Sequence, residues 1–150
     1  MKAGEDTEQI KLMNWAKSME DVKPELHLLF HIPNGGKRGK LEAERFKAMG
    51  VKAGVPDLML PVPRGKYKGI FIEMKYGDNT VSVHQRVFMR AAQDNGYYCV
   101  VCYGAAAAKR AIQIYLSLNG EAEITEASFE EVFNYKIHKT WGIPVVKPQE

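Results

Sequence analysis

The sequence predicts an α/β domain in which a small mixed β-sheet is flanked by helices. Helical patterns alternate with short apolar runs, turn residues separate them, and one helix-length crossover joins two of the expected strands. At 150 residues and 45% hydrophobic content, the chain has the size of one ordinary domain with a real core.

The first third of the chain predicts a helix, a strand and a second helix. Residues 5–22 carry apolar side chains at helical spacing. Residues 26–32 form an apolar run typical of a strand, and the Pro-Asn-Gly-Gly segment at 33–36 is a strong turn signal. Residues 41–49 indicate a short helix that ends at Gly50.

The middle of the chain predicts an antiparallel hairpin and a parallel crossover. The hairpin strands are expected over 56–62 and 69–76. A helix over 82–95, capped by its leading serine, connects to a strand over 97–103. A further helix is expected over 105–118, among residues that are good helix formers.

The C-terminal segment has weaker signals. We expect a main domain over residues 1–118 and an extension over 119–150, packed on the domain or trailing from it. Within the extension, the pattern suggests a helix near 128–138 and then a loose tail with two prolines.

Composition restricts the class of protein. Cys99 and Cys102 form a C-x-x-C, but they lie in a strand-like run where residues three apart face opposite sides. A second cysteine pair, which a four-cysteine zinc site needs, is missing from the sequence, so we interpret both as core residues. No stretch approaches the ~20 apolar residues of a membrane span, and Met1 to Asp6 lack the apolar run of a secretory signal. We therefore expect a soluble cytoplasmic protein without membrane contact or organic cofactor.

Charge is unevenly distributed along the chain. Between Lys37 and Lys75 basic residues outnumber acidic ones by ten to four, whereas after Asn119 acidic residues outnumber basic ones by six to three. The basic middle favours a polyanionic partner, although a merely solvated surface would have the same composition.

The hairpin brings two carboxylates together. If it is centred on Gly65, Leu58 faces Ile72 in the core, and Asp57 faces Glu73 on the other side. Lys75 follows two residues later on that same face. Opposed carboxylates repel each other, and a Mg²⁺ ion would offset the repulsion. The alternative is an ordinary Glu–Lys pair on a solvated face, with Asp57 as a turn residue.

A Pro-Asp followed by Glu-x-Lys on the next strand is the pattern of the PD-(D/E)xK nuclease superfamily. Within it the chain resembles the VRR-NUC family, as carried by small phage-encoded members. The resemblance covers roughly residues 5–103 and rests on these segments in order: Glu5 to Gln9, Trp15-Ala16, His31 to Gly36, Met49 to Asp57, Glu73 to Lys75, and Ser82 to Gln85.

The resemblance implies a restriction-endonuclease-like core and a set of site residues. Asp57 and Glu73 would be metal ligands, together with the backbone carbonyl of Met74. Lys75 would act on the attacking water or the transition state, and Gln85 would lie near the metal or orient the lysine. An acid from the first helix would complete the site. The match favours Glu5 for this role over Glu8.

The same resemblance suggests contacts to nucleic acid. His31 and Asn34 would contact phosphate at the mouth of the site, although a histidine beside an Asn-Gly-Gly turn is more often turn chemistry. Lys37 and Arg38 lie in a basic, glycine-rich loop, and Lys52 precedes the turn before Asp57.

Taken together, the sequence predicts a Mg²⁺-dependent DNA endonuclease, with Mn²⁺ as a possible substitute. Family members of this small type look like enzymes that cut branched DNA or four-way (Holliday) junctions. Symmetric cutting of a junction needs two sites, so a homodimer is expected. The alternatives are a restriction-type endonuclease and a DNA-binding module whose nuclease site is vestigial.

Overall fold

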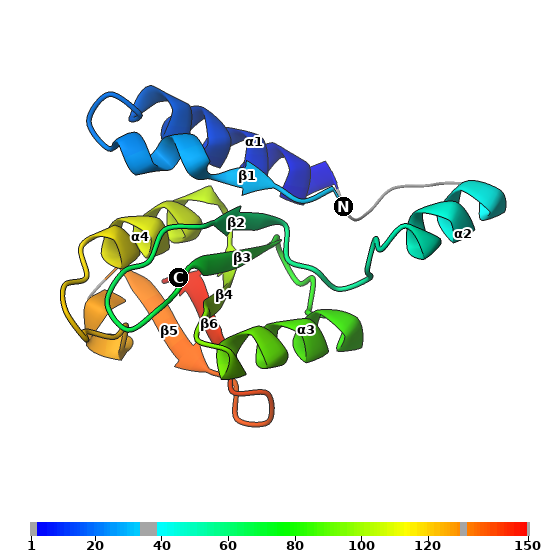
Figure 1. Ribbon diagram of the computed structural model, residues 1–150. Coiled ribbons are helices and arrows are strands. Elements are labelled where there is room, and N and C mark those ends of the chain that lie inside the picture. The colour runs from blue at the N-terminus through cyan, green and yellow to red at the C-terminus, as the bar shows by residue number, and fades with distance from the viewer. Residues whose placement is uncertain (1–2, 34–38, 130–131, 150) are drawn as a thin grey trace.

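The structure is a computed structural model that describes residues 3–33, 39–129 and 132–149. Its centre is a mixed sheet of six strands in the order β1-β2-β3-β4-β6-β5 (Figure 1). The strands are β1 Phe30–His31, β2 Leu58–Leu60, β3 Ile70–Lys75, β4 Tyr98–Tyr103, β5 Phe133–Ile137 and β6 Pro144–Pro148. The helices are α1 Ala3–Ser18, α2 Lys40–Ala48, α3 Val83–Asp94 and α4 Ala105–Leu116, with 3₁₀ turns η1 Pro24–Leu28 and η2 Glu126–Phe129.

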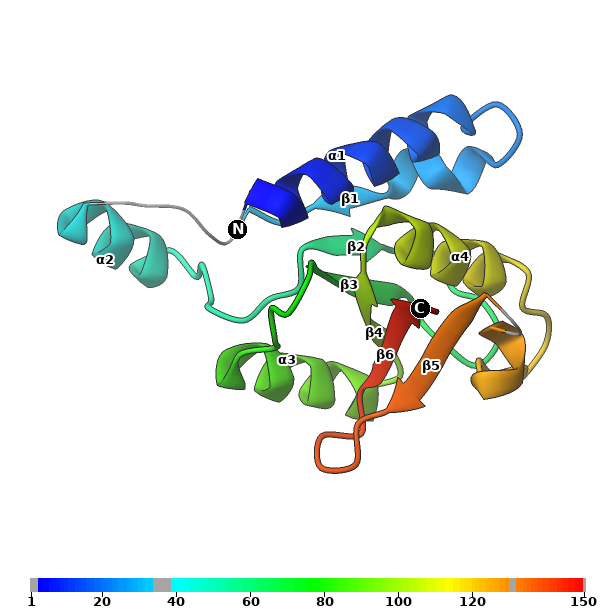
Figure 2. The same cartoon turned by 180° about the vertical axis from the view of Figure 1, so that it is seen from behind.

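Apolar side chains on both faces of the sheet pack against the helices that flank it. Helices α1 and α4 pack on one face, where Leu12 and Ile112 join Leu58 and Ile72 in a buried cluster. Helix α3 covers part of the opposite face, where its Met89 packs in a second cluster. Figure 2, seen from behind, shows the same arrangement, with α1 and α4 above the sheet and α3 below it. The predicted α/β class is confirmed.

The β2–β3 hairpin has the predicted register. Leu58 pairs with Ile72, and Leu60 pairs with Ile70. All four side chains are fully buried, because alternation along each strand sends them to the same face of the sheet. This register directs Glu73 and Lys75 to the α3 face.

The crossover from β3 through α3 to β4 also follows the prediction. β3 and β4 are parallel, so Lys75 and Tyr103 are neighbours at their C-terminal ends. Helix α3 begins with a capping box in which the Ser82 hydroxyl accepts from the Gln85 N–H, and the Gln85 amide oxygen accepts from the Ser82 N–H. Cys99 and Cys102 are buried, free, and in the two different clusters, as expected of opposite faces.

The strand predicted over 26–32 is wrong for most of its length. Residues 24–28 form the 3₁₀ turn η1, and only Phe30–His31 pair as a strand. Pro24 fixes a helical φ at the start of the turn. Leu26 and Leu29, three apart, are the buried members of the run, which is a helical spacing. The first helix likewise ends at Ser18, four residues before the predicted end.

The helix predicted near 128–138 and the loose tail are also wrong. Residues 133–137 form β5, and residues 144–148 form β6, which pairs antiparallel with β5 and parallel with β4. Phe133, Tyr135 and Ile137 alternate with polar residues, which is the period of a strand. Residues 144–148 therefore belong to the same sheet as the hairpin.

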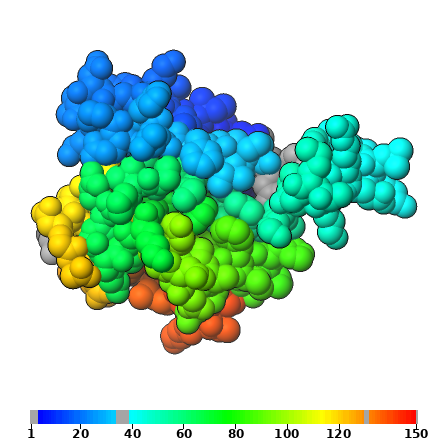
Figure 3. Space-filling view, viewed as in Figure 1, coloured from blue at the N-terminus to red at the C-terminus, as the bar shows by residue number. Residues whose placement is uncertain are grey.

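Helix α2 is present within one residue of its predicted bounds, but it stands away from the body of the molecule (Figure 3). None of its residues is buried, and Leu41 is 83% exposed. Among the described residues, no helix is both long and apolar enough to cross a membrane.

Candidate active site

Asp57 is fixed at the start of β2 by a backbone contact from the neighbouring strand. Its Oδ2 accepts a 2.8 Å hydrogen bond from the Met74 N–H. The loop before it makes a close approach to α3. A Cβ at Gly54, whose φ is +90°, would collide with the His84 carbonyl oxygen. The glycine of the Gly-Val-Pro-Asp motif thus allows the Asp57 loop to lie against the N-terminus of α3.

Glu73 and Lys75 lie on the α3 face of β3 and are almost entirely removed from solvent. Glu73 is 2% exposed and Lys75 is 7% exposed. Lys75 Nζ lies 3.3 Å from Glu73 Oε2. The other carboxylate oxygen, Glu73 Oε1, is buried without a hydrogen-bond partner among the described residues. A buried carboxylate oxygen of this kind usually has a partner, so the site offers one open coordination position.

The electrostatics of the site favour a proton or a cation. Burial, followed by repulsion from Asp57, raises the pKa of Glu73 to about 8, although Lys75 counteracts the shift. Burial also raises the pKa of Asp57, and Glu5 adds to this effect. Asp57 therefore disfavours the charged form of Glu73, as expected of opposed carboxylates.

Gln85 connects α3 to the carboxylates. Its Nε2 donates a 2.9 Å hydrogen bond to Glu73 Oε2. Its Oε1 accepts from the backbone N–H of Ser82. One side chain thus caps the helix and contacts the buried acid, so the helix start is fixed relative to Glu73.

Glu5 and Glu8 lie on α1 but have different surroundings. Glu5 is 5% exposed and raises the pKa of both Asp57 and Glu73. Glu8 Oε1 accepts a 3.0 Å hydrogen bond from the N–H of Ala105, the first residue of α4. That bond is the main reason why the pKa of Glu8 is lowered. The structure thus brings Glu5 to the site, whereas Glu8 caps a helix.

Comparison with known proteins identifies the family. The family model of the VRR-NUC domain matches residues 4–106, which contain all of the site residues described in this subsection. The chain belongs to the VRR-NUC family. A solved structure described as a VRR_NUC domain protein is 34% identical, with a TM-score of 0.69 over 80% of this chain and 93% of that one. No curated protein matches the chain. The fold is therefore restriction-endonuclease-like, and the chain is a nuclease-type domain.

Asn79 and Tyr103 support the acid that α1 contributes to this VRR-NUC site. Asn79 Nδ2 donates a 2.6 Å hydrogen bond to Glu5 Oε2. The Tyr103 hydroxyl donates to the Asn79 carbonyl at 2.6 Å. Asn79 is a site residue that the sequence did not predict. Its position in the turn four residues after Lys75, the last residue of β3, is the one signal that points to it.

Of the five residues predicted to contact nucleic acid, one lies at the site, one lies away from it, and three are outside the described residues. His31 is at the site, because its Nδ1 donates to the Asp57 carbonyl at 2.8 Å. Lys52 is exposed in the loop between α2 and β2, and no contact to the site involves it in the described part of the chain. Asn34, Lys37 and Arg38 lie outside the described residues.

The residues present fit a hard divalent cation. Glu73 Oε1 is open, and Asp57 and Glu73 repel each other. In the described part of the chain, no three Asp, Glu, His or Cys side chains converge as a complete ligand set. Mg²⁺ commonly takes only one or two carboxylates and completes its shell with waters and phosphate oxygens. The donor set therefore suits Mg²⁺ better than a metal that needs a closed protein cage.

Proposed function

We propose that this VRR-NUC domain is a metal-dependent DNA endonuclease that hydrolyses phosphodiester bonds. The observation that supports the proposal is the meeting of Asp57, Glu73 and Lys75 on one sheet face, with Glu73 Oε1 buried and open. A purely structural Glu–Lys pair would not need the second carboxylate beside it, since that carboxylate destabilises the charged form.

In this proposal Asp57 and Glu73 hold Mg²⁺, and the family resemblance adds the Met74 carbonyl. Bound there, the ion would polarise the phosphoryl oxygen and favour ionisation of the attacking water. The water oxygen forms a new bond to phosphorus while one ester P–O bond breaks. The products are a phosphate monoester and a free hydroxyl.

The other residues have distinct parts in the proposal. Lys75 is a cation on the same face as the carboxylates, positioned to stabilise negative charge that develops on the phosphate. Gln85 holds the Glu73 carboxylate in place through Oε2, which leaves Oε1 free for the metal. Glu5, held by Asn79, is the third carboxylate and is positioned to orient water near the metal.

We further propose that selectivity is for DNA structure, such as branches or four-way junctions, and that the chain acts as a homodimer. A domain of this size has little room for base-reading elements, so backbone shape is expected to dominate recognition. Two cuts placed symmetrically require two sites. Helix α2 has no buried residue, and short isolated helices are marginal in water, which is consistent with a contact to a second chain.

The test is cleavage of a labelled four-way junction, a flap, a plain duplex and a single strand, each with Mg²⁺, with Mn²⁺ and with EDTA. We expect metal-dependent cutting that favours branched DNA, and a dimer mass by light scattering. Cutting of duplex at one defined sequence would instead support a restriction-type enzyme. Binding without cutting under every metal would support a vestigial site.

A further inference from the structure

The sheet register extends the site face into a row of polar side chains that leads away from the carboxylates, from half-buried Tyr103 to exposed residues of β5 and β6. Lys75 is adjacent to Tyr103 on β4. The β4–β6 pairing places Lys147 beside Tyr103, and Lys147 in turn pairs with Asn134 on β5. Lys136, two residues after Asn134 and on the same face of β5, pairs with Val145 of β6. We call Tyr103, Asn134, Lys136 and Lys147 the basic row.

The basic row is a surface with free positive charge. Lys136 and Lys147 are exposed and form no ion pair in the part of the chain that the structure describes. Lys147 Nζ lies 4.5 Å from the centroid of the Tyr103 ring, which directs its charge toward the active-site end of the row. The segment after Asn119 is acidic overall. Because side chains alternate along β5 and β6, both lysines nevertheless lie on the α3 face of the sheet.

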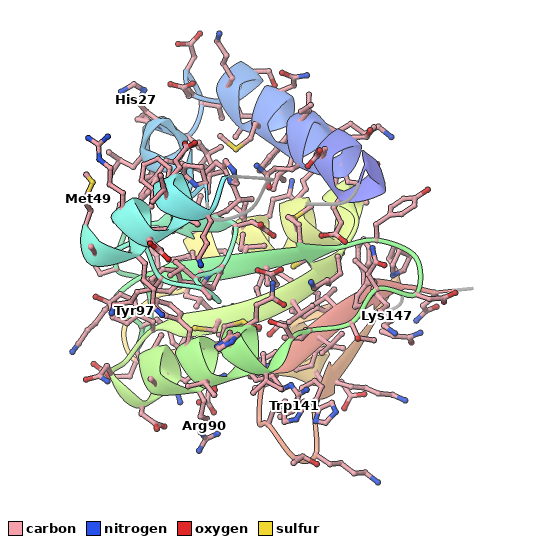
Figure 4. The ribbon with its side chains drawn as sticks, turned by 90° about the vertical axis from the view of Figure 1, so that its right-hand side faces the viewer. His27, Met49, Arg90, Tyr97, Trp141 and Lys147 are labelled. Atoms are coloured by element: carbon pink, nitrogen blue, oxygen red, sulfur yellow. The ribbon has the colours of Figure 1, made fainter. Side chains whose placement is uncertain are left out.

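An open depression lies along this row, between α3 and the β5–β6 hairpin. It is lined by Tyr103, Lys136 and Lys147, whereas Glu73 and Lys75 do not line it. Its acidic residues, Glu123 and Glu126, lie before β5, and Glu123 is paired with Lys66. In Figure 4 Lys147 and Trp141 both lie on the β6 side of the sheet, with α3 beside them.

The loop between β5 and β6 is fixed to α3 by an aromatic stack. The Trp141 ring stacks on His138 at a centroid distance of 3.5 Å, and the Arg86 guanidinium lies 4.0 Å from the Trp141 centroid. Two groups this close to one ring must lie on opposite sides of it, so both faces of the indole are covered. A nucleotide base therefore has no free tryptophan face on which to stack, which leaves the lysines as the main recognition elements.

We infer that the basic row is a phosphate-contacting track, which carries a DNA strand away from the active site over the β5–β6 hairpin. This inference rests on the proposed function and adds to it a contact surface whose two lysines lie outside residues 4–106, the range of the family match. From β3 to β5 the row crosses three strand spacings, roughly 14 Å. That is the axial length of about four nucleotides of one strand. Contacts of this kind position DNA without reading its sequence.

The test compares two charge-matched double variants. Lys136→Gln/Lys147→Gln removes the charges of the track, and Lys17→Gln/Lys23→Gln removes two exposed charges from the α1–η1 region. Binding of labelled branched DNA and duplex is measured by fluorescence anisotropy in EDTA over a series of salt concentrations. A third variant, Lys136→Arg/Lys147→Arg, restores the charge.

We expect the track variant to bind about 5–20-fold more weakly, and the slope of log affinity against log salt to fall by about 1.8, for two lost phosphate contacts. The arginine variant recovers affinity, and the α1–η1 control stays within twofold of wild type. With metal, the track variant raises KM and leaves kcat unchanged.

The outcomes separate the inference from the proposed function. If wild type cuts DNA but the track variant binds no more weakly than the control, the track is refuted and the nuclease stands. If wild type binds DNA through the track but cuts nothing under any metal, the track is supported and the nuclease proposal fails. If wild type binds no DNA, both are refuted.

Discussion

Gln85 Nε2 donates a 2.9 Å hydrogen bond to Glu73 Oε2, while the same side chain caps α3 through Ser82. This relationship links the first turn of a helix to a buried carboxylate on the central strand β3. Variants at Gln85 and Ser82 can therefore separate an effect on catalysis from an effect on stability. The Ser82 hydroxyl takes part in the cap by accepting from the Gln85 N–H, whereas of the two only Gln85 bonds to Glu73.

Gln85→Ala and Ser82→Ala are expected to have similar stabilities but different activities. Each loses one half of the capping box, so the free energy of unfolding falls by about 1 kcal/mol in both. Gln85→Ala also loses the donor to Glu73, and its activity falls roughly 10–100-fold. Chemical denaturation and cleavage rates measure the two effects. Equal activity in the two variants would show that Gln85 acts only as a cap.

Glu5 and Glu8, both on α1, provide a second pair of variants that separates an effect on catalysis from an effect on stability. Glu5→Gln is expected to reduce cleavage roughly 10–100-fold. Glu8→Gln weakens the cap at the N-terminus of α4 and lowers stability by about 1 kcal/mol, with near-normal cleavage. A Glu8→Gln variant that is stable but inactive would reverse the assignment of the two acids.

The raised pKa of Glu73 predicts a pH dependence of stability in the metal-free protein. The folded-state pKa of about 8 lies above the ordinary value of 4.5, so the folded protein retains a proton that the unfolded chain loses. Stability from this group is therefore lost as pH rises from about 4.5 to about 8. Glu73→Gln should therefore be more stable than wild type at pH 8, because its amide stays neutral where the buried carboxylate ionises.

Thermal unfolding in EDTA from pH 5 to 9 measures this effect. The exposed carboxylate of Glu121 provides the control, because Glu121→Gln should follow the wild-type curve. Parallel curves for wild type and Glu73→Gln would contradict the raised pKa.

Metal binding should oppose this loss of stability. A cation binds the ionised carboxylates, so its affinity rises with pH and binding releases protons. Millimolar Mg²⁺ is expected to raise the Tm of wild type more at pH 8.5 than at pH 6. The gain should disappear in Asp57→Asn. Identical Tm shifts at the two pH values, or a full gain in Asp57→Asn, would place the cation elsewhere.

The placement of Asp57 opposite Glu73 was predictable because it depends only on the local geometry of a hairpin. A hairpin centred on Gly65 with a period of two residues determines which side chains share a face, and the observed register agrees. The position of Glu5 needed the family resemblance, because its contact with Asn79 joins residues 74 positions apart. Strand propensity and turn signals carry no information at that separation.

The C-terminal hairpin shows where local reasoning failed. Strand β6 lies between β4 and β5, so its pairing depends on a long-range contact that the alternating pattern does not reveal. Its buried residues are few, Pro144 and Val146, which is why the segment resembled a loose tail. The basic row depends on that pairing and could not be predicted from charge counts along the chain.

The most direct test of the nuclease claim is a comparison of wild type and Lys75→Ala on labelled branched DNA. Cleavage with Mg²⁺ and binding in EDTA are measured on the same preparations. We predict that wild type cuts only with metal, and that Lys75→Ala loses cutting by at least ~100-fold while its affinity stays within a fewfold of wild type. Metal-dependent cutting that persists in Lys75→Ala, or wild-type protein that binds but never cuts, would contradict an active site built on Asp57, Glu73 and Lys75.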